Sequence, residues 1–216
     1  MSICSLPLAR RPNRAFAKLG GLCAIFGMLI ALAQPAHAAD PQAATTFVQN
    51  VANQAIQILR QTGDSAQREA AFQDMMQQNV DLPRVARFTL AKYWRQASSQ
   101  QQQDFQELFK TYMVHVYSAR LKQYSGETVK TTGTTKDNQD QIVVHSEITR
   151  PGGGQAVKVD WRVRQDSNGL KLVDIAVEGV SMAITQRSEF NSVIANNGGD
   201  INALLQKMRE ALSQNG

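Results

Sequence analysis

The spacing of hydrophobic residues along the chain changes twice, from three or four residues to two and back again. A spacing of three or four places apolar side chains on one face of a helix. The early stretches with this spacing predict helices over residues 47–59, 66–80 and 85–94, with Pro83 as a boundary between the last two. The part of the chain before residue 126 is therefore expected to be helical.

The longest predicted helix begins at Ser99. Its hydroxyl and the side chain of Gln102, three residues later, match the pattern of a capping box. A broad apolar stripe follows from Phe105 to Tyr124, as expected for a helix with one face in a core.

In the middle of the chain, hydrophobic residues alternate with polar ones. Residues 155–164 carry apolar side chains on one face and charged side chains on the other, which is typical of an antiparallel sheet with one solvated face. The other elements are predicted as strands over 128–136, 142–148 and 170–177 and as helices over 182–195 and 201–212. Glycine-rich turns join the last three strands as hairpins. The sequence predicts an α+β fold, an antiparallel β-meander of about four strands curved against several helices.

The first 38 residues have the pattern of a secretory signal peptide. A cationic segment over residues 10–18 precedes about 14 apolar residues, and Ala36-His37-Ala38 forms a small-residue cleavage site. The apolar run is too short to span a bilayer, which needs roughly 20 residues. We expect export to the periplasm, cleavage after Ala38 and a single domain over residues 39–216.

Removal of this segment changes the cysteine content and the charge. Both cysteines, Cys4 and Cys23, lie within it, so the remaining chain can form neither a disulfide nor a cysteine-ligated metal site. Four of the 23 Lys and Arg residues are also lost, which leaves 19 basic against 18 acidic residues and a net charge of about +1. No concentrated basic surface for nucleic acid or phosphate is expected.

The remaining sequence shows no pattern of catalytic residues. Gly179-Val-Ser-Met-Ala183 departs from the G-x-S-x-G pattern of a nucleophilic serine, so Ser181 is expected to cap the helix that follows. His145, on a predicted strand, shows no obvious partner, and neither it nor His115 is expected to bind a metal, because further ligands would come from scattered carboxylates. We expect a protein that is not an enzyme and has no metal or cofactor.

Two segments resemble the MlaC family, also called toluene-tolerance auxiliary proteins. The first is FTLAKYWRQASSQQQQDFQELFKTYMVHVYSARLKQYSG, residues 88–126, with the aromatic pair Tyr93-Trp94 and the ending Tyr124-Ser-Gly126. The second is DWRVRQDSNGLKLVDIAVEGVSMAITQRSEFNSVIANNGGDINALLQKM, which contains the block Glu178-Gly-Val-Ser181. The resemblance covers roughly residues 45–213, and Ala91 stands where the family often has glycine.

Members of this family are periplasmic phospholipid-binding components of an intermembrane lipid transport system. The resemblance implies that the helices and the sheet enclose an apolar cavity for acyl chains, with the stretch from Glu178 to Met182 beside its mouth. Phospholipid would be the cargo. The implied partners are an inner-membrane lipid ABC transporter complex with an MCE-domain subunit and an outer-membrane lipoprotein–porin complex, and the implied role is maintenance of outer-membrane lipid asymmetry by a monomer.

The candidate cavity-lining residues come from the apolar faces of the long helix and the sheet. They are Tyr93, Phe105, Phe109, Met113, Val116, Val157, Val159, Trp161, Val173, Ile175, Val177, Val180 and Met182. Three alternatives stay open: a carrier of hopanoids or other polycyclic lipids, an enzyme with Asp160 or Asp174 directed into the cavity, and an interaction module whose apolar faces close into a core.

Overall fold

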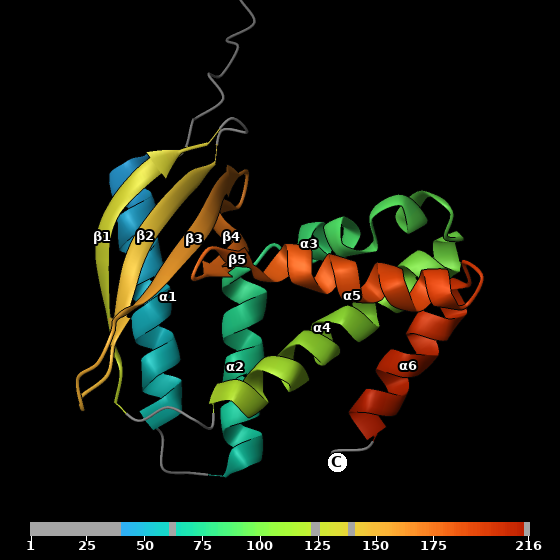
Figure 1. The fold of residues 1–216 in the computed structure, drawn as a ribbon, viewed down its shortest axis with the longest axis horizontal. Coiled ribbons are helices and arrows are strands. Elements are labelled where there is room, and N and C mark those ends of the chain that lie inside the picture. The colour runs from blue at the N-terminus through green and yellow to red at the C-terminus, as the bar shows by residue number, and fades with distance from the viewer. Residues whose placement is uncertain (1–39, 61–63, 122–125, 138–140, 214–216) are drawn as a thin grey trace, which may run out of the picture. The chain divides into compact units, whose positions relative to one another are not determined.

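The computed structural model describes residues 40–60, 64–121, 126–137 and 141–213, all of which belong to one compact unit. The helices are α1 (Pro41–Arg60), α2 (Ser65–Asn79), α3 (Leu82–Leu90), α4 (Ser99–Leu121), α5 (Met182–Asn196) and α6 (Ile201–Ser213), with a 3-10 helix, η1 (Ala91–Arg95), after α3 (Figure 1). The predicted signal peptide and Tyr124 lie outside the described residues, so export and the cleavage site stay predictions.

The sheet is an antiparallel meander, as predicted. Its strands follow chain order: β1 (Thr128–Lys136), β2 (Ile142–Thr149), β3 (Val157–Asp166), β4 (Gly169–Val177) and β5 (Val180–Ser181). The two-residue β5 was not expected, because it is too short to show an alternating pattern. The pairing is irregular at two places, between Thr131 and Gly133 of β1 and between Arg162 and Val163 of β3.

Helix α1 covers one face of the sheet, and Figure 1 shows it running along the strands. Its small and branched side chains, Ala44, Val48 and Val51, pack against buried residues of the strands, among them Val144 and Val163. We call this cluster the sheet core. The alternation of β2 and β3 turns these valines toward the helix and the charged residues toward the other face, as the sequence predicts.

A second and larger cluster lies among α2 to α6 and includes Ile58 near the end of α1, and we call it the helix core. Phe105 and Phe109 of α4 have ring centroids 5.7 Å apart, and Phe190 of α5 meets Phe105 edge-on at the same distance. All three rings are buried. Burial of each contributes roughly 1.5–3 kcal/mol to folding, so this aromatic contact is a main link between α4 and α5.

Several helix boundaries differ from the sequence-based expectations, and α1 already begins at Pro41 rather than at residue 47. The helix expected over residues 85–94 ends at Leu90, because Ala91 has a φ of 53° and cannot continue it. The cap of α4 is Ser98 rather than Ser99: the Gln101 N–H donates to Ser98 Oγ (3.2 Å) and the Ser98 N–H donates to Gln101 Oε1 (3.0 Å). The capping box exists, one residue earlier than predicted.

None of the helices in the described ranges has both the length and the apolar character that a bilayer crossing requires.

The shifted capping box gives a direct test. Ser98→Ala removes the acceptor for the Gln101 N–H and should lower the free energy of unfolding by about 1 kcal/mol. Ser99→Ala is the matched control, since its hydroxyl makes no hydrogen bond to a described residue, and it should change little. Urea unfolding of both variants measures the difference, and equal losses would contradict the assignment of Ser98 as the cap.

The backbone at Ala91 gives a second test. Because a non-glycine residue at positive φ is strained by about 1–3 kcal/mol, Ala91→Gly should raise the free energy of unfolding by about 1 kcal/mol after the extra flexibility of glycine in the unfolded chain is included. Ala70→Gly, an exposed position inside α2, should instead lower it by about 1 kcal/mol. Denaturant midpoints of the two variants must therefore move in opposite directions.

Candidate functional site

The candidate lining residues from the helices lie mostly inside the helix core. Tyr93 of η1 and Phe105, Phe109 and Met113 of α4 are buried there. Val116, one turn after Met113 on α4, is only half-buried and belongs to neither core. The structure therefore brings four of these side chains together as packed core and leaves the fifth at its edge.

Five of the candidates from the sheet share one face. Val157, Val159 and Trp161 alternate along β3, and the pairings of Val159 with Val177 and of Trp161 with Ile175 extend that face onto β4. It is the same face that α1 covers farther along the strands. Val159 is buried, whereas Val157 and Val177 are half-buried.

Trp161 lies where the sheet core ends, and its ring is held in place by a hydrogen-bond chain. The indole Nε1–H donates to Ser146 Oγ (2.8 Å), and Ser146 Oγ donates to the carbonyl of Val159 (3.0 Å). The buried polar groups are thus satisfied within an apolar surface. Val173 falls at the pairing irregularity, between Leu172 opposite Val163 and Asp174 opposite Arg162, and so has no partner residue on β3.

The two cores adjoin each other at Val80, which packs against both. Beyond that contact, the half-buried side chains of Val116, Val157 and Val177 belong to neither core. These half-buried side chains of α4, β3 and β4 are the candidates that correspond to the predicted cavity. The enclosed cavity itself stays a prediction.

The turn between β4 and α5 is built around a carboxylate. Asp174 accepts hydrogen bonds from Ser181 Oγ (2.6 Å), from the Ala183 N–H (3.0 Å) and from its neighbour Ile175 N–H (2.9 Å). Ser181 in turn caps α5 by accepting the Ile184 N–H at 3.1 Å. The predicted capping role of Ser181 is confirmed.

The last two candidates flank Ser181. Val180 is 56% exposed, and Met182, the first residue of α5, is half-buried. The side chain of Val180 is thus largely exposed to solvent rather than enclosed.

The expectation that His145 lacks a partner is wrong. Its Nδ1 lies 2.7 Å from Asp160 Oδ1 and its Nε2 lies 3.1 Å from Thr135 Oγ1, across three neighbouring strands. Alternation on the sequence shows the face but not the cross-strand neighbour, which explains the error. The trio lies on the face of the sheet opposite Trp161, so Asp160 is not directed toward the apolar candidate site as the enzyme alternative would require.

No cluster of three or more His, Cys, Asp or Glu side chains suited to a metal occurs in the described part of the chain. The other carboxylate of the enzyme alternative, Asp174, accepts the three hydrogen bonds at the start of α5. The described residues at the candidate site can therefore supply apolar contact.

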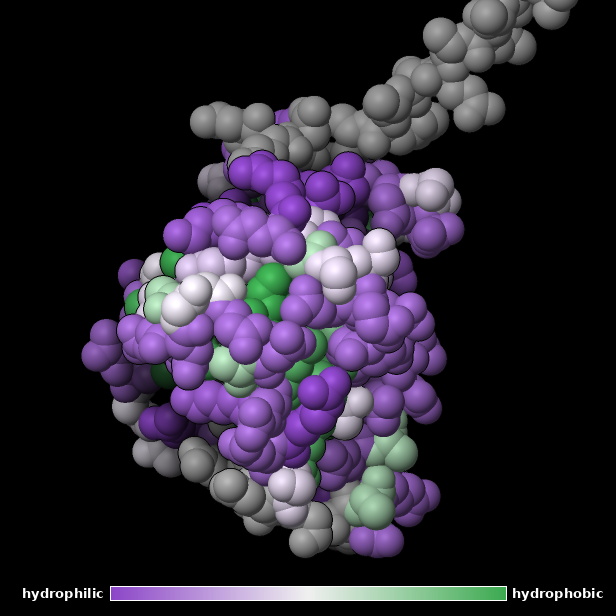
Figure 2. Space-filling view, turned by 90° about the vertical axis from the view of Figure 1, so that its right-hand side faces the viewer, coloured by the Kyte–Doolittle hydropathy of each residue, from purple (hydrophilic) through white to green (hydrophobic). Residues whose placement is uncertain are grey.

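A groove that the sequence did not indicate lies between α5 and α6. Its volume is about 720 Å³, within the usual range of small-molecule pockets. Its floor consists of the helix-core residues Phe190, Leu204 and Met208. Viewed from the side on which α5 and α6 lie, the surface shows a strip of hydrophobic residues bordered by hydrophilic ones (Figure 2). Periodicity identifies the apolar face of each helix but not the separation of two helices, which is why this groove was missed.

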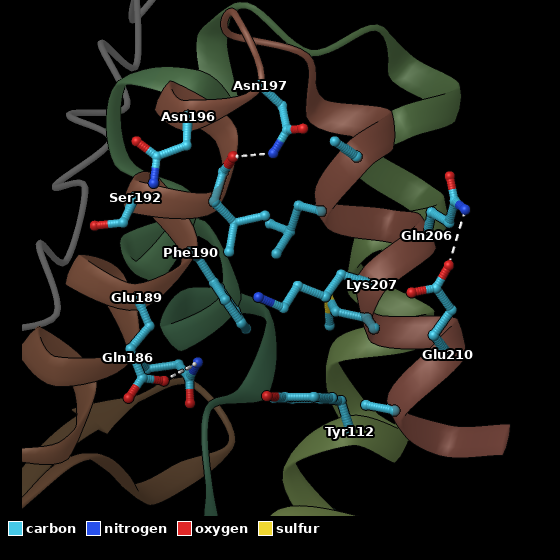
Figure 3. Close-up of a pocket in the computed structure, with 15 residues that line it drawn as sticks. Tyr112, Gln186, Glu189, Phe190, Ser192, Asn196, Asn197, Gln206, Lys207 and Glu210 are labelled. Atoms are coloured by element: carbon cyan, nitrogen blue, oxygen red, sulfur yellow. Dashed lines mark hydrogen bonds between the residues drawn. The ribbon is translucent and has the colours of Figure 1, made fainter. Parts of the chain in front are cut away.

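Polar side chains surround the groove. Figure 3 shows Lys207 extending from α6 into the space between the two helices, whereas Gln206 and Glu210 pair with each other on the outer side of α6. Burial of the Tyr112 hydroxyl, with a further contribution from the Glu189 carboxylate, raises the pKa of Tyr112 above its usual value. The phenol therefore stays a neutral hydrogen-bonding group at this edge. None of the candidate lining residues borders this groove.

Comparison with known proteins identifies the family to which this combination of an open meander and helices belongs. The family model described as "MlaC protein" matches residues 49–210. The chain belongs to the MlaC family. This confirms the sequence resemblance, and the α+β architecture agrees with it.

Two similar proteins extend the comparison. The toluene tolerance protein ttg2D of Pseudomonas putida is 24% identical over 110 residues, and the match spans about half of either protein, 51% of this chain and 51% of that one. The solved structure of a phospholipid-binding protein from Ralstonia solanacearum, in complex with a phospholipid, aligns with a TM-score of 0.67 and 25% sequence identity. That alignment covers 79% of this MlaC-family chain and 97% of the Ralstonia chain.

The role of Ser181 as a cap can be tested by rescue. Ser181→Ala removes both the cap and the donor to Asp174, and it should lower the free energy of unfolding by about 1–2 kcal/mol. Ser181→Thr keeps a hydroxyl at the same place and should recover most of that loss. Urea unfolding of the two variants makes the comparison, and an alanine variant as stable as the wild type would contradict the capping role.

Proposed function

We propose that this protein is a phospholipid carrier that shields acyl chains from water. The observation that carries the proposal is the Ralstonia protein, which was solved with a phospholipid and aligns with this chain over 97% of its own length. Membership of the MlaC family supports the same function.

The physical requirement for such a carrier is apolar surface. Each methylene group moved from hydrocarbon into water costs about 0.8 kcal/mol, so one acyl chain of about 16 carbons costs on the order of 12 kcal/mol to expose. The half-buried side chains of Val116, Val157 and Val177, which neither core includes, provide surface of this kind. The apolar sheet face continues from Val157 and Val177 to Trp161, whose one polar group is already bonded to Ser146.

The site of action in this proposal is the periplasm, reached through the predicted signal peptide. The carrier exchanges phospholipid with an inner-membrane ABC transporter complex that has an MCE-domain subunit and with an outer-membrane lipoprotein–porin complex, and so helps to maintain outer-membrane lipid asymmetry. The family resemblance supports these partners. The carrier needs no catalytic group, in agreement with a candidate site made of aliphatic and aromatic side chains.

A pair of valine variants tests the placement of the lipid. Val157→Glu places a carboxylate on the apolar face of β3, where an unpaired charge against hydrocarbon costs several kcal/mol. We expect at least a tenfold loss of bound phospholipid with little change in melting temperature, because water can enter once the lipid has left.

The control is Val143→Glu, also a half-buried valine but on the opposite face of the sheet, where it lies across from Arg162. This variant should retain its lipid. Native mass spectrometry and thermal melting of the same preparations give both quantities. A wild-type protein without bound lipid would contradict the carrier function, whereas a fully loaded Val157→Glu variant would contradict only the placement of the site.

A further inference from the structure

The helices α3 and η1 and the first turns of α5 form a surface on which cations and exposed apolar side chains lie together. We propose that this surface docks on a lipid bilayer with anionic headgroups. We call it the basic face. Its residues are Arg84, Arg87, Phe88, Lys92, Arg95, Val180, Ile184 and Arg187.

The cations of the basic face are concentrated and unneutralised. Between Asp81 and Asp104 the chain contains four Lys and Arg residues and no acidic residue. Arg187 of α5 joins them, because its guanidinium lies 5.3 Å from the ring centroid of Phe88 on α3. No ion pair links any of these five cations to a described residue. The expectation that the chain has no concentrated basic surface is therefore wrong. The net charge of the chain after residue 38 is close to zero, and this sum conceals the local excess of cations.

Three acidic groups lie beside the basic face, and none of them forms an ion pair with its cations. Asp81 accepts the Arg84 N–H at the start of α3, and Glu178 accepts the N–H of Lys158. Glu189 accepts a hydrogen bond from Gln186 on its own helix. The five cations of the face outnumber these three carboxylates, so a positive excess is left for an external anion.

Exposed apolar side chains occur on the same face. Three large hydrophobic side chains of the described chain are markedly exposed: Phe88 (41%), Val180 (56%) and Ile184 (60%). Phe88 lies against Arg187, and Ile184 precedes Arg187 by three residues, so that the two share one side of α5. Val180 lies in the strand that leads directly into this helix. Large apolar side chains are rarely grouped on a surface without a function.

Cations also lie against the rings of η1. The guanidinium of Arg87 is 6.0 Å from the ring centroid of Trp94, and the ammonium of Lys92 is 5.0 Å from that of Tyr93. Tyr93 is buried, but the partly exposed Trp94 beside Lys and Arg is typical of the level at which lipid headgroups meet acyl chains.

A bilayer fits this combination better than a folded acidic partner does. The exposed side chains of Phe88, Val180 and Ile184 need no matching pocket in a bilayer, because the fluid interface closes around them, whereas a protein surface must provide one. Each cation near an anionic membrane strengthens association several-fold. The inference is independent of the proposed lipid cargo, since docking requires no lipid in the carrier.

Vesicle sedimentation tests the proposal with protein purified from cells that express the full chain. The protein should pellet with phosphatidylcholine vesicles that contain phosphatidylglycerol, much less with pure phosphatidylcholine, and progressively less as salt is added. The combined variant Arg84→Gln, Arg87→Gln and Arg187→Gln should bind on the order of 100-fold more weakly. The double variant Phe88→Ser and Ile184→Ser should also bind the anionic vesicles more weakly, but its binding should depend on salt as strongly as that of the wild type.

The matched control removes the same charge elsewhere. Lys130→Gln, Lys158→Gln and Lys207→Gln change three exposed cations outside the basic face and should leave binding within about twofold. The proposal is overturned if the wild type does not bind anionic vesicles at low salt, which would leave an acidic protein as the partner of this face. It is also overturned if the control variant loses as much binding as the arginine variant. The salt dependence of the wild type provides a test that needs no variant to fold.

Discussion

The contact of residues 80 and 81 with β4 joins the two halves of the fold. The Asp81 N–H donates to the Leu172 carbonyl at 2.9 Å, and Val80 pairs with Leu172 in a short bridge while its side chain packs against both cores. The Asp81 carboxylate caps α3 at the same point. This short segment thus adds a backbone connection between the helices and the sheet to the packing of α1 on the strands, and it sets the start of α3. The sheet core and the helix core can then remain separate, and apolar surface is left that neither core includes.

That remaining surface is the part of the structure on which a carrier depends. An acyl chain offers no polar group, so a protein that holds one needs shape and apolar area rather than reactive side chains. The polar groups near the candidate site are consistent with this requirement. Ser146 satisfies the indole of Trp161, and Asp174 and Ser181 satisfy the start of α5. Family membership and the phospholipid in the Ralstonia protein support the same interpretation.

The sequence predicted the α+β meander and most element boundaries, because alternation and helical spacing are local signals. It placed the helix cap at Ser99 instead of Ser98, since either serine has a glutamine three residues later. It could not show that Ala91 ends α3, because a positive φ arises from the surrounding fold. Periodicity likewise identified Phe105 and Val157 as inward-facing. It did not show that Phe105 lies in the closed helix core whereas Val157 is half-buried outside both cores. The partners of His145 and the grouping of Arg187 with α3 depend on tertiary contacts that no local pattern contains.

The two edges of the sheet have a consequence for the behaviour of the protein at high concentration. An open sheet exposes unpaired N–H and C=O groups at its first and last strands, which can template β-aggregation. Here β1 is rich in threonine and lysine and its pairing is interrupted between Thr131 and Gly133, while β5 ends the other side after two residues. Neither edge offers a long, flat, apolar strand for another chain to extend. The fold can therefore keep its apolar sheet face available to a ligand while its edges resist the growth of fibrils.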